Sequence, residues 1–274
     1  GLSAILHKKL NIHSPPVLGR WREYIENLRH PDREITVAMC GKYTKLEDSY
    51  ASIIESFNHC AAHLRCKINL KWVETSDLED LQDLEDVDGV VVPGGFGTRG
   101  TEGKIQVIRL VRERHIPFLG LCLGLQLAVI EYARHLCGLE GANSTEFDPD
   151  TPHPVIDILP EQRDIVDKGG TMRLGAYRAL LQEDTRVRKL YDAPEASERH
   201  RHRYEVNPDY HDLLLEKGMI FSGLSEDGRL VEFIELPDHP FFVATQAHPE
   251  LKSRMETPAP LFFGFVKACG DVLA

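Results

Sequence analysis

The fold is decided by an apolar run, Ile116-Pro117-Phe118-Leu119, by the turn Gly120-Leu121-Cys122-Leu123-Gly124 that follows it, and by Leu125-Gln126-Leu127-Ala128-Val129-Ile130-Glu131-Tyr132-Ala133. The pattern predicts a strand, a tight turn and a helix, with Cys122 at the turn. Glycines suit this corner because it needs unusual φ/ψ angles and close backbone packing. The stretch therefore indicates a βα unit that presents a thiol at its bend.

Similar units precede this stretch. The sequence predicts strands at 35–40, 68–73 and 89–92, and helices at 48–65, 78–84 and 104–114. Near-continuous apolar strands that alternate with helices are typical of a parallel sheet covered on both faces. We therefore expect an α/β fold with an open, mostly parallel sheet flanked by helices, as in flavodoxin-like proteins.

The second half of the chain is richer in turns. It predicts short strands at 155–159, 172–181, 204–206 and 220–223, and a last helix from about Pro260. Ser225-Glu226-Asp227-Gly228 contains an Asp-Gly pair next to an apolar run, which predicts a hairpin. A length of 274 residues suits one large domain rather than two independent ones, so we expect these extra strands to belong to the same domain.

The N-terminal residues look different from the rest. Residues 1–33 contain the breakers Ser14-Pro15-Pro16 and His30-Pro31-Asp32, with a short amphipathic pattern from Trp21 to Leu28. We expect residues 1–33 to be an interdomain linker remnant and residues 34–274 to form one domain. A connector at this position suggests a further domain upstream.

Charge and cysteine content exclude several classes of protein. The formal charge of −11 argues against nucleic acid or an anionic membrane as the main partner. The six cysteines form no C-x-x-C pair and no zinc spacing, and no signal peptide or long apolar span occurs. We expect a cytoplasmic protein with reduced thiols and no metal. The basic segment Arg199–Arg203 alternates with histidines in a strand-like pattern and is interpreted as a pocket wall.

Cys122 is a candidate nucleophile. At a helix N-terminus the dipole favours a thiolate, and free backbone N–H groups can bind an oxyanion. The alternative is a buried structural cysteine, the commonest fate of a free thiol. The glycine-flanked turn alone leaves both interpretations open.

A thiolate that attacks an amide also needs a base, and His248 is the best candidate. Residues i and i+2 of an extended segment share a face, so Glu250 can reach the outer nitrogen of His248 across Pro249. That pairing would fix the imidazole as the third member of a catalytic triad does. The alternative is a strand-end His-Pro turn with a solvated glutamate. Four weaker candidates lack such a carboxylate: His115, His135, His200 and His202.

A glycine-rich turn, Pro93-Gly94-Gly95-Phe96-Gly97-Thr98-Arg99-Gly100, follows the strand expected at 89–92. Residues 95–100 match G-x-G-x-x-G, the pattern of a dinucleotide site. The strand is not the first of its region, Pro93 interrupts the turn, and no acidic residue follows at about twenty positions. The preferred interpretation is therefore an oxyanion hole, formed by the N–H groups of Gly95 and Leu123.

Taken together, Pro-Gly-Gly-Phe-Gly at 93–97, Gly-Leu-Cys-Leu-Gly-Leu-Gln at 120–126 and His-Pro-Glu at 248–250 resemble the class I (triad-type) glutamine amidotransferases. Longer motifs are similar to the glutaminase domains of the CTP synthase family, over about residues 34–274. These motifs are Thr98–Lys104, Ala142–Phe147, Gly169–Gly175 and Glu198–Asn207. Leu251 departs from the usual Phe, a swap of one apolar residue for another.

The resemblance implies a glutaminase in which Cys122, His248 and Glu250 form the triad. It implies glutamine contacts from Gly95, Leu123, Gly124, Leu125, Gln126, Glu146 and Arg203. From the residues alone, Glu146 is equally a loop carboxylate that caps a turn. Met172-Arg173-Leu174-Gly175 is similar to the family's lid segment, which is implicated in activation by GTP, so Arg173, Leu174 and Gly175 are candidate lid residues.

The resemblance also implies partners. In that family a separate N-terminal synthetase domain uses ATP and Mg²⁺ to aminate UTP to CTP, and the full-length enzyme is a homo-oligomer, expected to be a tetramer. The sequence contains no G-x-x-x-x-G-K-[ST] phosphate loop, so we expect the C-terminal half of such an enzyme, with no cofactor in this chain. Two alternatives remain: a related cysteine hydrolase of γ-glutamyl peptides, and a catalytically silent regulatory domain.

Overall fold

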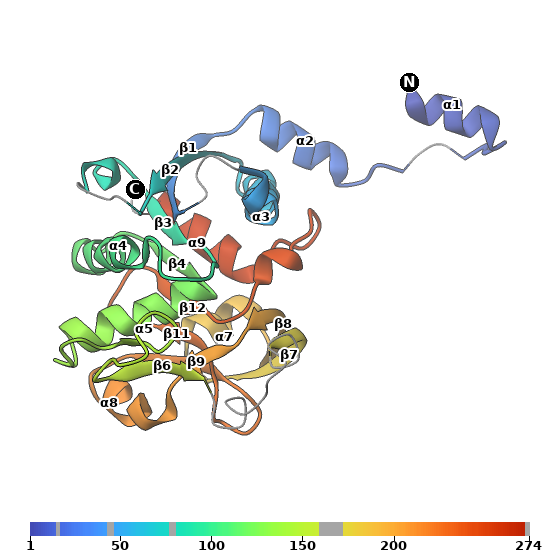
Figure 1. Cartoon of the computed structure of the whole chain (residues 1–274). Coiled ribbons are helices and arrows are strands. Elements are labelled where there is room, and N and C mark those ends of the chain that lie inside the picture. The colour runs from blue at the N-terminus through green and yellow to red at the C-terminus, as the bar shows by residue number, and fades with distance from the viewer. Residues whose placement is uncertain (15–16, 43–46, 77–80, 159–171, 272–274) are drawn as a thin grey trace.

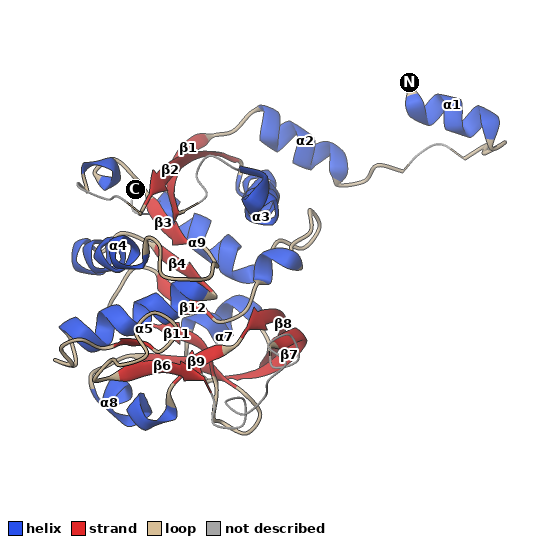
Figure 2. Cartoon of the chain, viewed as in Figure 1, coloured by secondary structure: helices blue, strands red, loops and turns tan. Residues whose placement is uncertain are grey.

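A nine-stranded sheet forms the centre of the molecule (Figures 1 and 2). The structure is a computed structural model that describes residues 1–14, 17–42, 47–76, 81–158 and 172–271. The strand order is β2 (Cys66–Glu74), β1 (Arg33–Gly41), β3 (Gly89–Val92), β4 (Phe118–Leu121), β12 (Phe242–Thr245), β11 (Val231–Glu235), β10 (Ile220–Leu224), β7 (Arg173–Leu181) and β8 (Glu195–His202).

The sheet is mixed. The pairs from β2 to β12 are parallel, and those from β12 through β11, β10 and β7 to β8 are antiparallel. A separate sheet contains β5 (Asn143–Ser144), β6 (Pro154–Ile158) and β9 (Tyr204–Val206). The predicted open α/β fold is thus confirmed, and the short strands of the second half extend its sheet in the antiparallel sense.

Helices cover both faces of this sheet. The apolar side chains of α4 (Thr101–Arg114) and α5 (Leu123–His135) join one core, and those of α3 (Ala51–Leu64), α7 (Arg186–Tyr191) and α9 (Pro260–Asp271) join the other. All four residues of β3 and all four of β4 are buried, because helices lie on both sides of them. Within the described residues, no helix is long and apolar enough to cross a membrane.

Several elements differ from expectation. The helix expected at 78–84 is only a 3-10 turn, Gln82–Leu84, in the residues that are described, and residues 77–80 lie outside them. Strand β8 is longer than the sequence indicated, and α7 and α8 (His211–Glu216) were not predicted. Other 3-10 turns are Glu47–Tyr50, Pro208–Tyr210 and Pro249–Leu251. The hairpin through 225–228 is confirmed by the β10–β11 pairing.

The two N-terminal helices behave differently. Helix α1 (Leu2–Lys9) buries no residue and extends away from the body of the molecule (Figure 1). Helix α2 (Trp21–Arg29) buries Tyr24 and Asn27, and its Asn27 amide donates to the carbonyl of Ala62 in α3 at 2.7 Å. Part of the predicted linker is therefore packed against the domain.

Candidate active site

Cys122 sits at the corner between β4 and α5. Its backbone has φ +50° and ψ −99°, a strained conformation for a residue with a side chain. Its N–H donates to the carbonyl of Thr245 at 2.7 Å, which ties the corner to β12. A Cβ on Gly124 would lie 2.3 Å from the carbonyl oxygen of Val92, so only glycine lets α5 start this close to β3. The corner places the thiol above the carboxyl ends of the parallel strands, where open α/β sheets bind ligands.

His248 is held by Glu250. His248 Nδ1 and Glu250 Oε1 are 2.7 Å apart, and because an ionised carboxylate only accepts, Nδ1 carries the hydrogen and Nε2 faces elsewhere. The pairing was predicted on an extended segment, but the structure forms it differently. Strand β12 ends at Thr245 and Pro249 begins a 3-10 turn, which suits the fixed φ of proline.

The imidazole and the thiol interact directly. Burial lowers the pKa of His248, but hydrogen bonding to Cys122 and Glu250 and the charges of both partners outweigh it, so the pKa is raised to about 10. Gly94 provides the room for this contact: a Cβ there would lie 2.8 Å from His248 Cε1 and 3.5 Å from Cys122 Cβ. The arrangement favours a protonated imidazole beside the sulfur.

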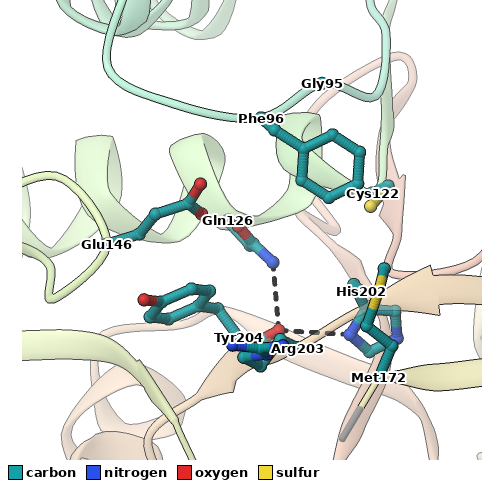
Figure 3. Close-up of a pocket in the computed structure, with 9 residues that line it drawn as sticks. All are labelled: Gly95, Phe96, Cys122, Gln126, Glu146, Met172, His202, Arg203 and Tyr204. Carbon is teal, nitrogen blue, oxygen red and sulfur yellow. Dashed lines mark hydrogen bonds between the residues drawn. The ribbon is translucent and has the colours of Figure 1, made fainter. Parts of the chain in front are cut away.

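Two cavities meet at Cys122. The first, of about 280 Å³, is lined by Gly95, Phe96, Cys122, Gln126, Glu146, Met172, His202, Arg203 and Tyr204 (Figure 3). The second, of about 420 Å³, is lined by His248 and Glu250 and includes Cys122, Gly95 and Arg201. The thiol can therefore meet a ligand in the first cavity while the imidazole approaches it from the second.

The first cavity brings together most of the side chains predicted to contact substrate. Glu146 Oε1 accepts from the N–H of Gly97 at 2.9 Å, so the glycine-rich turn holds this carboxylate. Gln126 Nε2 donates to the carbonyl of Tyr204 at 3.0 Å, beside Arg203 (Figure 3). A carboxylate and a guanidinium on one cavity wall complement a ligand that carries both charges, such as a free amino acid. Leu123, Gly124 and Leu125 lie in the first turn of α5.

Residues 45–268 match the family model described as glutamine amidotransferase class-I. The chain belongs to the class I glutamine amidotransferase family. The match covers β3, the corner at Cys122 and the His248–Glu250 pair, so all parts of the candidate site lie within it.

Relatives of this amidotransferase carry a more specific name. The chain is 53% identical over 278 residues to a CTP synthase of Methanococcus maripaludis, with 98% of this chain and 52% of the relative covered. It is 54% identical over 255 residues to a CTP synthase of Sulfolobus acidocaldarius, with 92% and 48% covered. The chain thus spans about half the length of the curated relatives it matches.

Among solved structures, the amidotransferase resembles a Trypanosoma brucei CTPS glutaminase domain with bound acivicin. The TM-score is 0.80 at 35% identity, with 86% of this chain and 94% of that chain covered. The strand and helix arrangement around Cys122 is therefore one that a CTPS glutaminase domain also adopts.

The predicted lid residues of this amidotransferase lie in different surroundings, some buried and some exposed. Arg173 does not line the cavity; its guanidinium is buried, with Nη1 3.2 Å from Glu205 Oε1 and Nη2 2.7 Å from Glu232 Oε1. Leu174 is 66% exposed, and Gly175 has φ +105°. Only the neighbouring Met172 reaches the cavity. A lid role for Arg173, Leu174 and Gly175 stays a prediction.

Two histidines of the basic segment are paired at the cavity, where His202 lines the wall and His200 lies next to it. His200 Nδ1 and His202 Nε2 are 2.9 Å apart, and His202 Nδ1 lies 3.2 Å from the carbonyl of Tyr204. Burial, with Arg173 and His248 nearby, lowers the pKa of His200 to about 3, so the ring is neutral. The interpretation of 199–203 as a pocket wall agrees with His202 and Arg203 lining the cavity.

Sequence reasoning missed one polar residue of the site, Gln246. Its side chain is fully buried, and Nε2 lies 3.6 Å from Cys122 Sγ. The available signal was a single amide inside the apolar stretch 241–247, two residues before His248. The pairing of Thr245 in β12 with Leu121 in β4 places Gln246, the next residue, beside Cys122.

Proposed function

We propose that the chain hydrolyses L-glutamine to glutamate and ammonia, with Cys122 as nucleophile, His248 as base and acid, and Glu250 as the group that orients His248. One observation carries the proposal: a strained corner places a thiol between a cavity with opposite charges and a histidine held by a carboxylate at 2.7 Å. Family membership and the bound acivicin of the trypanosome neighbour support it.

The chemistry follows from this geometry. The thiolate of Cys122 attacks the side-chain amide carbon, and the N–H groups of Gly95 and Leu123 hold the oxyanion. His248 Nε2 gives its proton to the departing ammonia, which leaves a γ-glutamyl thioester on Sγ. A water molecule then loses a proton to His248 and attacks the thioester, and its C–S bond breaks to release glutamate and the thiolate.

Glutamine recognition is assigned to the first cavity. Glu146 pairs with the α-ammonium group and Arg203 with the α-carboxylate, since charge-assisted hydrogen bonds supply both affinity and orientation. Gln126 and the backbone of Gly95, Leu123, Gly124 and Leu125 border the amide end, next to the sulfur. In this arrangement the reacting amide lies over Cys122 and the charged end lies away from it.

For the whole protein, we propose that the ammonia serves the ATP-dependent amination of UTP to CTP in a synthetase domain. The name shared by the curated relatives and the length of those relatives beyond this chain support the assignment. ATP, Mg²⁺ and the activator GTP would act in that larger enzyme, as a homo-oligomer. The glutaminase domain proposed here comprises residues 34–274.

Labelling with acivicin, followed by mass spectrometry of the digest, tests the nucleophile. We expect Cys122 to be the site, because burial raises the pKa of the other thiols, Cys40 to about 12 and also Cys60, Cys66, Cys137 and Cys269. Cys137, which is only partly buried, is the internal control. A label on Cys137 with Cys122 unmodified would contradict the proposal.

Activity is measured in parallel. The parent chain should release ammonia from glutamine, and Cys122→Ala should release none above background. A γ-glutamyl peptide, offered under the same conditions, distinguishes a peptide hydrolase from a glutaminase. A parent chain that hydrolyses the peptide faster than glutamine would overturn the substrate assignment.

A further inference from the structure

Gln246 is positioned by the same strands that position Cys122. Thr245 of β12 pairs with Leu121 of β4, so the residues that follow each strand lie side by side. The N–H of Cys122 donates to the Thr245 carbonyl at 2.7 Å, and the N–H of Gln246 donates to the Glu232 carbonyl at 2.9 Å. The backbone on both sides of the sulfur is thereby fixed, and the Gln246 side chain is fully buried against it.

The orientation of the Gln246 amide follows from its neighbours. The Tyr204 carbonyl can only accept, so Gln126 must present Nε2 to it, at 3.0 Å. The same Nε2 lies 3.3 Å from Gln246 Oε1, which accepts its second hydrogen. The oxygen of Gln246 therefore faces Gln126, and its Nε2 faces Cys122 Sγ at 3.6 Å. No flipped arrangement satisfies all three contacts.

We propose that Gln246 is a further catalytic residue, which donates a hydrogen bond to Cys122 Sγ and stabilises the thiolate. The proposal rests on Cys122 being the nucleophile, as argued above. His248 already gives the Cys122 sulfur a charged partner. Gln246 adds an uncharged hydrogen-bond donor, which does not compete with the thiolate for the proton of His248. The amide is fully buried, and a hydrogen bond shielded from water is electrostatically stronger than one made in solvent.

The contact matters at two points of the cycle. Before attack, it favours the ionised sulfur over the neutral thiol, because a donor stabilises the charged form. Once Sγ is acylated, the sulfur carries no charge and the contact weakens. When the hydrated thioester collapses, the C–S bond breaks with its electron pair on Sγ, and the Gln246 N–H meets the charge as it forms. Gln246 thus assists both thiolate formation and thiolate departure.

The chain is tested as Gln246→Met, which keeps the length of the side chain and removes its donor. The matched control is Gln106→Met, on the exposed face of α4. Iodoacetamide alkylation of Cys122 is followed across pH by mass spectrometry, and kcat and KM for glutamine are measured at pH 7. In Gln246→Met we expect the midpoint of alkylation to rise by roughly one pH unit and kcat to fall about 10-fold, with KM little changed. The control should match the parent.

A second variant guards against misfolding. Gln246→Glu retains the acceptor for Gln126 but puts a carboxylate where the donor was, so the alkylation midpoint should rise further than in Gln246→Met. If Cys122 of the parent is alkylated normally and the pH midpoint of alkylation is unshifted in both variants, the role of Gln246 is overturned while the proposed function stands. A parent chain in which Cys122 is not alkylated at any pH, and which releases no ammonia from glutamine, would overturn the proposed function as well.

Discussion

In the proposed mechanism, Glu250 takes part in the chemistry through His248. Its carboxylate bonds Nδ1 at 2.7 Å and is itself buried, which suits the proposed role of holding the ring and stabilising the imidazolium. We expect His248→Ala to reduce glutamine hydrolysis by on the order of 10⁴-fold or more, and Glu250→Gln to cost roughly one-tenth to one-hundredth as much. Initial rates of ammonia release measure both.

The pH profile of activity distinguishes a specific loss of the Glu250–His248 contact from a general loss of structure in the Glu250→Gln variant. The pKa of His248 is raised from about 6.5 in the unfolded chain to about 10 in the fold. The stability that the imidazolium contributes is therefore fully present below pH 6.5 and is lost as the pH rises through 10. Glu250→Gln removes one of the groups that raise this pKa. The alkaline limb of activity should therefore move to lower pH. An unchanged limb in an active Glu250→Gln variant would argue against the assigned pairing.

Some site residues could be predicted from spacing and others could not. Cys122 became a candidate through its glycine-flanked turn, and His248 and Glu250 became candidates through their separation of two. Gln246 depends on the alignment of β12 with β4, which no local pattern reveals. Glu146 was indistinguishable from a turn cap until the fold brought its carboxylate to the Gly97 N–H.

Strand β7 contributes Arg173 to a buried cluster of charged side chains. Arg173 is the only guanidinium bonded to both Glu205 and Glu232 among the described residues, and burial raises the pKa of both carboxyl groups, that of Glu205 to about 8. Arg173→Met leaves two buried carboxyl groups without this cation, so we expect a loss of about 3–5 kcal/mol in unfolding free energy at pH 8. Urea unfolding measures it.

The pH dependence of the stability loss in Arg173→Met tests whether the loss is electrostatic. A carboxyl group whose folded pKa is raised stabilises the fold below its unfolded value near 4.5, and this contribution is lost as pH rises through about 8. The loss in Arg173→Met should therefore be smaller at pH 5 than at pH 8. Arg178→Met, on the same strand with an exposed side chain, is the control and should change little. Equal losses of Arg173→Met at both pH values would contradict the electrostatic explanation.

The predictability of the elements follows the same physics. Strands β3 and β4 are apolar throughout because both faces are buried, and their positions were predicted closely. Strand β8 alternates in burial, but three of its inward residues are Glu198, His200 and His202. A polar inward face hides the usual period-two pattern, so the full extent of β8 appears only when Arg173 and its partners are in place.

The boundary of the domain is a property of the whole chain. Breakers near residues 14–16 and 30–32 suggested a single connector over residues 1–33. The structure divides that connector. Tyr24 is 3% exposed and stacks on His63 at a ring separation of 4.7 Å, whereas α1 buries nothing in the described structure. Helix α2 thus belongs energetically with α3.

Two truncations test this division. Removing residues 1–18 should shift the melting temperature by no more than about 1 °C, because α1 buries no side chain. Removing residues 1–31 also exposes the surface under Tyr24 and breaks the Asn27–Ala62 hydrogen bond, at a cost of about 2–4 kcal/mol. For a chain of this size that corresponds to a decrease of roughly 5–10 °C, measured by thermal unfolding. Tyr24→Ala in the full chain should reproduce part of the decrease, and Trp21→Ala, at a residue that is 45% exposed, should cause less. Equal melting of the two truncated chains would show that α2 contributes nothing to the domain, and would return its boundary to residue 34.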